Sequence, residues 1–294
     1  MIFDLHMHSR ASDGTLAPAE VVKLAAACGV DVIALTDHDA TDGVAEARAE
    51  AGRLGVGFVA GVEVSVTWNG RLLHIIGLGI DERHPDLQQG LAGLREARRA
   101  RAFKMAEKLE RSGIPDALAR VEEYANGPVI SRTHFARFLV DAGYVATPEQ
   151  AFRRYLRRGK RAYVPMQWAP LEQAIGWING AGGTAVIAHP LRYGLGPQPL
   201  RAMVADFKAC GGEAIEVIGS GHDPSEYERL ARLANEFGLM ASCGSDFHDP
   251  AGRVLPGRYP ALPDDCVPIH ERVHASLAAA AARGVAQHTS RPAA

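Results

Sequence analysis

Short apolar runs alternate with helix-like segments along most of this chain, and this alternation limits the folds that it can adopt. From residue 1 to about 80, runs such as IFDLH, VDVIALTD and VGFVAGVEVSV are separated by helical patterns near residues 18–28 and 43–54. The pattern returns late in the chain with GGTAVIAHP, EAIEVIGSG and LMASCGSDFH. Strands that alternate with helices over short connections are typical of βα units. We therefore expect an α/β fold whose mostly parallel sheet or barrel contains strands from both ends of the chain.

The middle of the chain has a different character. Between residues 82 and 162 the sequence carries long charged helical patterns, among them LREARRARAFKMAEKLERSG. These patterns predict a helical insertion into the barrel. We expect residues 1–81 and 163–294 to form one barrel domain, and residues 82–162 to form a helical insertion. The alanine-rich stretch from about residue 269 to 284 predicts a closing helix.

Composition narrows the class of protein further. Of the 294 residues, 47% are hydrophobic and 22% are charged, which is typical of a soluble globular protein. A formal net charge of -2 excludes a globally basic nucleic-acid coat. The four cysteines lack CxxC spacing, so neither a zinc knuckle nor a dithiol redox motif is expected. No apolar run approaches the roughly 20 residues of a spanning helix, so we expect a cytoplasmic protein without a membrane contact or an obligate protein partner.

Histidine, aspartate and glutamate residues occur on six separate strand candidates. The carboxyl ends of parallel strands converge on one crevice of an α/β sheet, where ligands and catalytic groups collect. A charge such as Glu63, inside the apolar run VGFVAGVEVSV, is costly to bury unless it is paired or binds a metal ion. With Asp13 from the nearby ASDG loop, the candidate metal ligands are His6, His8, Asp13, His38, Glu63, His74, His189, Asp246 and His248.

These nine candidates are six imidazoles and three carboxylates, without a thiolate. Mixed nitrogen and oxygen ligation favours manganese, iron or zinc in a catalytic site over a structural zinc site. Nine ligands are too many for one ion, so two or three divalent ions are expected, with manganese preferred. Two simpler interpretations stay open. His6 and His8 alone could be an ordinary histidine pair, and Asp13 could form an Asx turn before Gly14.

The motifs DLHMHS, ASDG, ALTDHD, GVEVS, the isolated His74, IAHP and GSDFH together resemble those of the PHP family, named for polymerase and histidinol phosphatase. They cover roughly residues 1–80 and 183–250 and occur in family order. The resemblance implies a distorted (β/α)7 barrel with a trinuclear metal site at the strand carboxyl ends, and hydrolysis of phosphate esters.

The same resemblance implies how the ligands are divided among three ions. The first ion would be bound by His6, His8, Glu63 and Asp246. Glu63 would bridge to a second ion held by His74 and His189. The third ion would be bound by Asp13, His38 and His248.

Within this family the chain is similar to stand-alone members that act on nucleoside 3',5'-bisphosphates. The resemblance implies removal of the 3'-phosphate to give a 5'-mononucleotide and phosphate, by attack of a hydroxide that bridges two metal ions. Two alternatives keep the metal site: a 5'-to-3' exonuclease on short oligoribonucleotides and a histidinol-phosphate phosphatase. A non-catalytic nucleotide-binding module is the alternative from another class, and it would be expected to lack ligands.

The insertion supplies candidate substrate contacts. Arg101 and Lys104, three residues apart in a basic helical pattern, are expected to face an anionic substrate together, although such runs are often only solvated. Arg132 and His134 lie just before an apolar helical pattern, where backbone N–H groups favour a phosphate. Arg132 would neutralise charge on the phosphoryl oxygens, and His134 would bind phosphate or protonate the leaving oxygen, unless it is an incidental residue of a capped helix. Arg192, just after IAHP, is expected to contact phosphate.

A second basic run in the insertion, RRYLRRGKR, contains six cations and no acid. It could attract a short oligonucleotide through its phosphates. The simpler interpretation, a soluble surface, is the one that we favour from the sequence.

Overall fold

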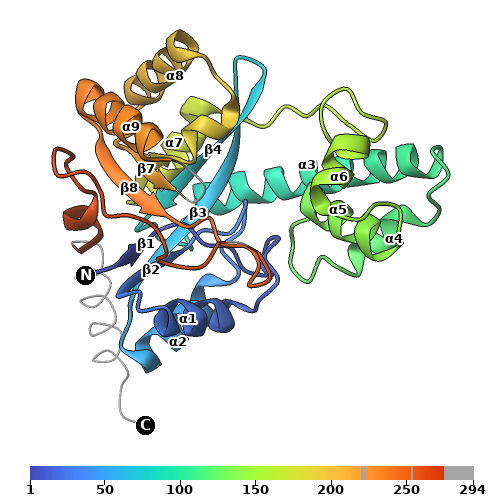
Figure 1. Ribbon diagram of the computed structural model, residues 1–294, viewed down its shortest axis with the longest axis horizontal. Helices are drawn as coiled ribbons and strands as arrows, with labels where there is room; N and C mark the ends of the chain where they lie inside the picture. Colours follow the sequence, from blue (N-terminus) through green and yellow to red (C-terminus); the bar gives the residue numbers. More distant parts are fainter. Residues whose placement is uncertain (220–222, 253, 275–294) are drawn as a thin grey trace.

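The structure is a computed structural model that describes residues 1–219, 223–252 and 254–274. Its sheet follows the order β1-β2-β3-β4-β6-β7-β8, with the short β5 paired to β3. The backbone N–H of Leu5 donates to the carbonyl of Cys243 at 3.1 Å, so the last strand lies beside the first and the sheet is nearly closed into a barrel (Figure 1). The strands are β1 (Phe3–Asp4), β2 (Val32–Leu35), β3 (Gly57–Trp68), β4 (Arg71–Leu78), β5 (Ala169–Pro170), β6 (Thr184–Ile187), β7 (Ala214–Gly219) and β8 (Met240–Gly244).

Helices cover the outside of this sheet, with α1 and α2 on one side and α8 and α9 on another (Figure 1). Proline is the first residue of α1, α8 and α9, a position where its missing N–H has no helical partner to lose. The barrel helices are α1 (Pro18–Ala27), α2 (Val44–Leu54), α7 (Leu171–Gly180), the short 3-10 helix η2 (Pro190–Tyr193), α8 (Pro197–Ala209) and α9 (Pro224–Phe237).

The sheet is mostly parallel, and β4 is the exception because a hairpin reverses the chain. Asn69 and Gly70 join β3 to β4 with φ angles of 46° and 71°, the left-handed backbone of a two-residue hairpin turn. β4 runs antiparallel to both β3 and β6. His74 therefore lies within a strand, directly opposite Ser65, and not at the carboxyl end of a parallel strand.

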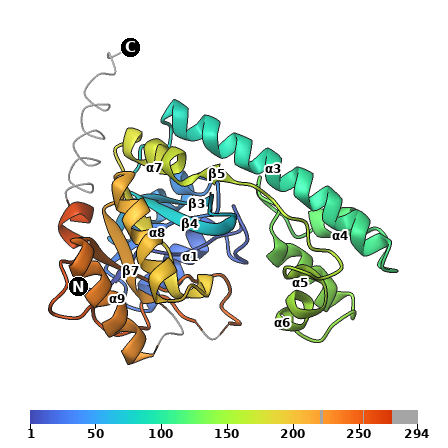
Figure 2. The ribbon, with the colours of Figure 1, turned by 90° about the horizontal axis from the view of Figure 1, so that it is seen from above.

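Residues between β4 and β5 form a cap made of helices that projects from the barrel (Figures 1 and 2). The first half of its long helix packs on the barrel core through Leu87 and Leu91, and the second half packs in a separate core with Met105 and Leu109. One helix thus connects two hydrophobic cores. The cap helices are α3 (Pro85–Glu110), α4 (Ala117–Glu122), α5 (Arg132–Asp141), α6 (Pro148–Ala151) and the π-helix η1 (Phe152–Leu156).

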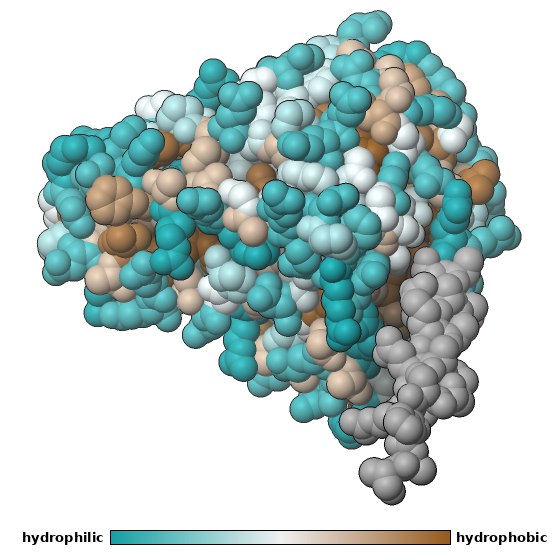
Figure 3. Space-filling model, turned by 180° about the vertical axis from the view of Figure 1, so that it is seen from behind, coloured by the Kyte–Doolittle hydropathy of each residue, from teal (hydrophilic) through white to brown (hydrophobic). Residues whose placement is uncertain are grey.

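Hydrophilic residues cover most of the face seen in Figure 3, and the hydrophobic ones are scattered over it. Of the helices that the structure describes, none has both the length and the apolar character needed to cross a membrane. Residues 270–274 are helical, and the remainder of the predicted closing helix, residues 275–284, lies outside the described residues.

Candidate metal centre

The nine candidate ligands meet at one end of the barrel, although they come from six segments of the chain. His6 and His8 follow β1, and Asp13 lies in the loop after them. His38 follows β2, and Glu63 and His74 lie on β3 and β4. The remaining three ligands follow β6 and β8: His189, Asp246 and His248.

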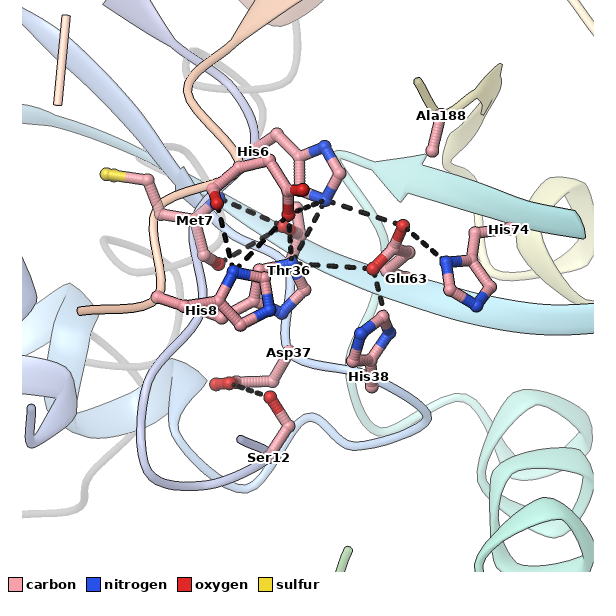
Figure 4. A network of polar contacts seen from close by, with 12 residues as sticks. His6, Met7, His8, Ser12, Thr36, Asp37, His38, Glu63, His74 and Ala188 are labelled. Carbon is pink, nitrogen blue, oxygen red and sulfur yellow. Dashed lines mark hydrogen bonds and ion pairs between the residues drawn. The ribbon is translucent and has the colours of Figure 1, made fainter. Parts of the chain in front are cut away.

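The carboxylate of Glu63 is the centre of this group. Its side chain is fully buried, and Figure 4 shows it between His38 and His74. Its two oxygens lie 2.7 to 3.5 Å from a ring nitrogen of each of five histidines: His6, His8, His38, His74 and His189. One carboxylate that contacts five imidazoles is suited to bridge metal ions.

Two further carboxylates complete the cluster. Asp246 Oδ1 lies 3.3 Å from His6 Nε2 and 3.1 Å from His8 Nε2. Asp13 Oδ1 lies 3.3 Å from His248 Nε2 and 3.9 Å from His38 Nε2. All nine candidates are therefore linked by contacts shorter than 4 Å.

Unpartnered buried atoms test whether these residues fit metal ions. Within the described residues, His8 Nδ1, Asp13 Oδ1, His38 Nδ1, Glu63 Oε2 and His189 Nδ1 are buried without a hydrogen-bond partner. Each such atom costs about 1–3 kcal/mol, which a bound cation would offset. His38 Nδ1 and Glu63 Oε2 lie 2.7 Å apart without forming a hydrogen bond, as two ligands of one ion would.

Three sets of donor atoms, each within 4.8 Å of one another, could hold ions. They overlap at shared residues. The sets are His8, Asp13, His38 and His248; His6, His8 and Glu63; and His38, Glu63 and His74. Nitrogen and oxygen donors in this number fit two or three divalent ions.

The charges of the cluster are set by burial and by mutual contact. Burial by itself raises the pKa of Glu63, but His38, His74 and His6 hold that pKa well below its usual range. Burial lowers the pKa of His74 to about 4. Burial also opposes protonation of His248, but Asp246 and Asp13 raise its pKa to about 9. The carboxylate of Glu63 is therefore ionised, and the imidazole of His74 is neutral and able to bind metal.

Other buried groups hold the ligands in place. Glu216 on β7 lies 2.8 Å from His6 Nδ1 and accepts the backbone N–H of His189. Such contacts orient metal-binding imidazoles. His189 and Asp246 have φ angles of 29° and 53°, a left-handed backbone that costs non-glycine residues about 1–3 kcal/mol. A charge within the apolar run EAIEVIGSG agrees with this supporting role of Glu216.

A cavity lies between the metal cluster and the cap. Asp13, His38 and His74 line it from the barrel, and Arg101 and Arg132 line it from the cap. Arg101 is 5% exposed, and its Nε is buried without a hydrogen-bond partner. Its guanidinium lies 4.8 Å from the ring of Trp168, and burial holds its pKa well below the usual range. Neither arginine has an acidic partner within the described residues, so this end of the cavity favours an anion.

Lys104, which was predicted to contact the substrate together with Arg101, lies outside the cavity lining. Its side chain is exposed and does not line the cavity. The inward face of α3 continues from Arg101 to Met105, four residues on, because an α-helix has 3.6 residues per turn. Arg98 was not predicted and does lie in the cavity wall, where its Nε donates to Asp39 at 2.6 Å and its Nη2 donates to Ser65 at 2.8 Å.

His134 lies behind the cavity wall and not in it. It is 1% exposed, its Nδ1 accepts the N–H of Ser131 at 3.2 Å, and its ring also lies close to the backbone of Ser12. Burial lowers its pKa to about 4, so the ring is neutral at pH 7. These contacts do not present a proton to the cavity. Arg192 is exposed and pairs with Asp246, so it contacts a candidate metal ligand and does not line the cavity with the other arginines.

A nearly closed α/β barrel with imidazoles and carboxylates gathered at one end of its sheet is the architecture of metal-dependent hydrolases. Comparison with known proteins makes the assignment specific. Residues 4–127 match the PHP domain, and the chain is 48% identical to a 3',5'-nucleoside bisphosphate phosphatase from Chromobacterium violaceum, over 93% of this chain and 97% of that relative. The chain belongs to the PHP family.

Two further similarities agree with this assignment. A 5'-3' exoribonuclease from Haemophilus influenzae is 44% identical over 92% of this chain and 98% of its own. A solved structure of an amidohydrolase from Chromobacterium violaceum, with bound sulfate and no metal, superposes with a TM-score of 0.90 at 48% identity and covers 94% of this chain and 97% of its own. The predicted PHP-type barrel is thereby confirmed.

Proposed function

We propose that this protein is a metal-dependent phosphatase that removes the 3'-phosphate from nucleoside 3',5'-bisphosphates to give a 5'-mononucleotide and phosphate. The observation that carries the proposal is the cavity with two different ends. One end holds the cluster around Glu63, and the other holds Arg101 and Arg132, which have no acidic partner within the described residues. A substrate with two phosphates would use both ends, whereas histidinol phosphate has one phosphate and would leave the arginines without a partner.

The nine residues of the cluster would bind two or three divalent ions, with manganese preferred and iron or zinc as alternatives. When bound, such ions supply Lewis acidity and lower the pKa of a coordinated water. The chain itself would position the substrate. Arg101 and Arg132 would bind the distal phosphate and offset its charge, and residues 82–162 would act as the substrate cap.

That His134 supplies the proton for the leaving oxygen stays a prediction. His134 was predicted for this step, but both sides of its ring are occupied by backbone groups of Ser131 and Ser12. Its contacts favour a positioning role. Arg192 would hold the carboxylate of Asp246 in place, because the two side chains form an ion pair.

A second candidate function, 5'-to-3' exonuclease activity on short RNA, is favoured by one specific observation. Phe152, the first residue of η1, lines the cavity. Directly after it, the hollow formed by Arg153, Arg154, Tyr155, Lys160 and Arg161 has a volume of about 300 Å³. These residues follow Phe152 closely in the sequence, and the phosphates of a longer strand would bind to them.

The test separates these functions by their products. Purified enzyme of known metal content would be incubated with adenosine 3',5'-bisphosphate, histidinol phosphate and a short 5'-phosphorylated RNA. The proposal expects phosphate and 5'-AMP in equal amounts from the bisphosphate. Release of 3'-AMP, or release of mononucleotides from RNA with no phosphate from the bisphosphate, would contradict it.

A further inference from the structure

Helix α5 of the cap contacts the cavity at one end and the loop that carries Asp13 further along. At its N-terminus, Ser131, Arg132 and Thr133 line the cavity. Arg137, five residues after Arg132, donates from Nη2 to the backbone carbonyl of Asp13 at 2.6 Å and from Nη1 to that of Gly14 at 3.4 Å. One short helix therefore faces both the substrate space and a candidate metal ligand.

Two further contacts hold the same loop, residues 9–14, against the cap. The ring of His134 lies close to the backbone of Ser12. Gly127, just before α5, packs so closely that a Cβ atom there would lie 2.3 Å from the carbonyl oxygen of Ala11. The loop's own contacts use other groups: Ser12 Oγ donates to Asp37, and the N–H of Gly14 donates to the carbonyl of Ser9. The path of the loop at Asp13 thus depends on the cap.

We infer that Arg137 is a positioning residue through which the cap and the metal centre are coupled. The inference rests on the proposed function, because it takes Asp13, His38 and His248 as ligands of one ion and Arg132 as a phosphate contact. A phosphate on Arg132 and an ion on Asp13 would both favour the docked arrangement of α5 on the loop. Each ligand would therefore strengthen binding of the other, and the effect is reciprocal by linkage.

The experiment measures metal binding and not turnover. Metal-free full-length protein would be titrated with Mn²⁺ by calorimetry, with and without 5'-AMP, which is the product and is not consumed. Arg137→Met keeps most of the side chain and removes its donors. The matched control is Lys108→Met, because Lys108 also donates to a backbone carbonyl, that of Tyr163 at 2.6 Å, but not to the loop of residues 9–14.

We expect Arg137→Met to bind one equivalent of Mn²⁺ about 10- to 100-fold more weakly, with the other equivalents unchanged. Addition of 5'-AMP should no longer tighten the binding of that equivalent, and the Lys108→Met protein should bind Mn²⁺ as the wild type does. Gly127→Ala disturbs the packing of the cap against Ala11 of the same loop, so it should weaken binding of the same equivalent of Mn²⁺. This second variant tests the inference if Arg137→Met does not fold.

The inference would be overturned if Arg137→Met and Gly127→Ala both bound Mn²⁺ as the wild type does. It would also be overturned if every equivalent of Mn²⁺ were weakened equally. A third result would overturn the proposed function together with this inference. If the wild-type protein binds no Mn²⁺, iron or zinc, the metal-dependent mechanism fails, whatever the variants do.

Discussion

Replacing Arg101 with methionine is expected to make the protein more stable and its substrate binding weaker. Arg101 is 5% exposed and has no acidic partner within the described residues, and its Nε is buried without a hydrogen bond. The unsatisfied group costs about 1–3 kcal/mol, and the stacking on Trp168 returns about 1 kcal/mol. The substitution should therefore raise the free energy of unfolding by about 1 kcal/mol and the melting temperature by about 2 °C.

The same substitution removes a charge-assisted contact to the distal phosphate, worth about 1.5–3 kcal/mol. The KM for adenosine 3',5'-bisphosphate should rise about 10- to 100-fold, as measured by phosphate release. Stability would be measured by thermal unfolding of the metal-free protein.

Arg98→Met, three residues earlier on α3, is the matched control. It leaves the buried Asp39 without its partner at 2.6 Å and should destabilise the protein by about 3–5 kcal/mol. The reasoning is refuted if Arg101→Met lowers the melting temperature as Arg98→Met does and leaves KM unchanged.

Three further predictions follow from the site. Glu63→Gln should abolish metal binding and hydrolysis, measured by metal analysis and phosphate release, because five imidazoles contact this one carboxylate. Lys104→Met should leave KM unchanged, whereas Arg132→Met should raise KM about 10-fold or more, because Arg132 lines the cavity and Lys104 does not. The pKa of His134 falls from 6.5 to about 4 on folding, so the unfolded chain binds the extra proton and stability is lost as pH falls from 6.5 to 4. In denaturant titrations at pH 7 and pH 4, His134→Gln should remove about 3 kcal/mol of that loss in the free energy of unfolding. Parallel pH profiles of this free energy for the wild type and the variant would contradict the prediction.

Much of the barrel could be predicted from the sequence, because strand and helix periods are local properties. The antiparallel direction of β4 was missed, although its signal was local as well: the Asn69–Gly70 pair between two apolar runs is typical of a two-residue hairpin. The π-helix η1 and the role of Trp168 had no comparable signal, because both depend on packing against distant segments.

The sequence by itself determined which residues could bind metal, and where along the chain they lie, because polar groups that end buried strands stand out against apolar neighbours. Only the tertiary structure decided which cations face the substrate. Arg98, Arg101 and Lys104 look alike in a basic helical run. The rotation of α3 against the barrel pairs Arg98 with Asp39, buries Arg101 without an acidic partner among the described residues, and exposes Lys104. It also decided the supports of the ligands, since Glu216 meets His6 across 210 residues and Arg137 meets Asp13 across 124. Contacts at such separations follow from how the elements pack, which a local pattern does not contain.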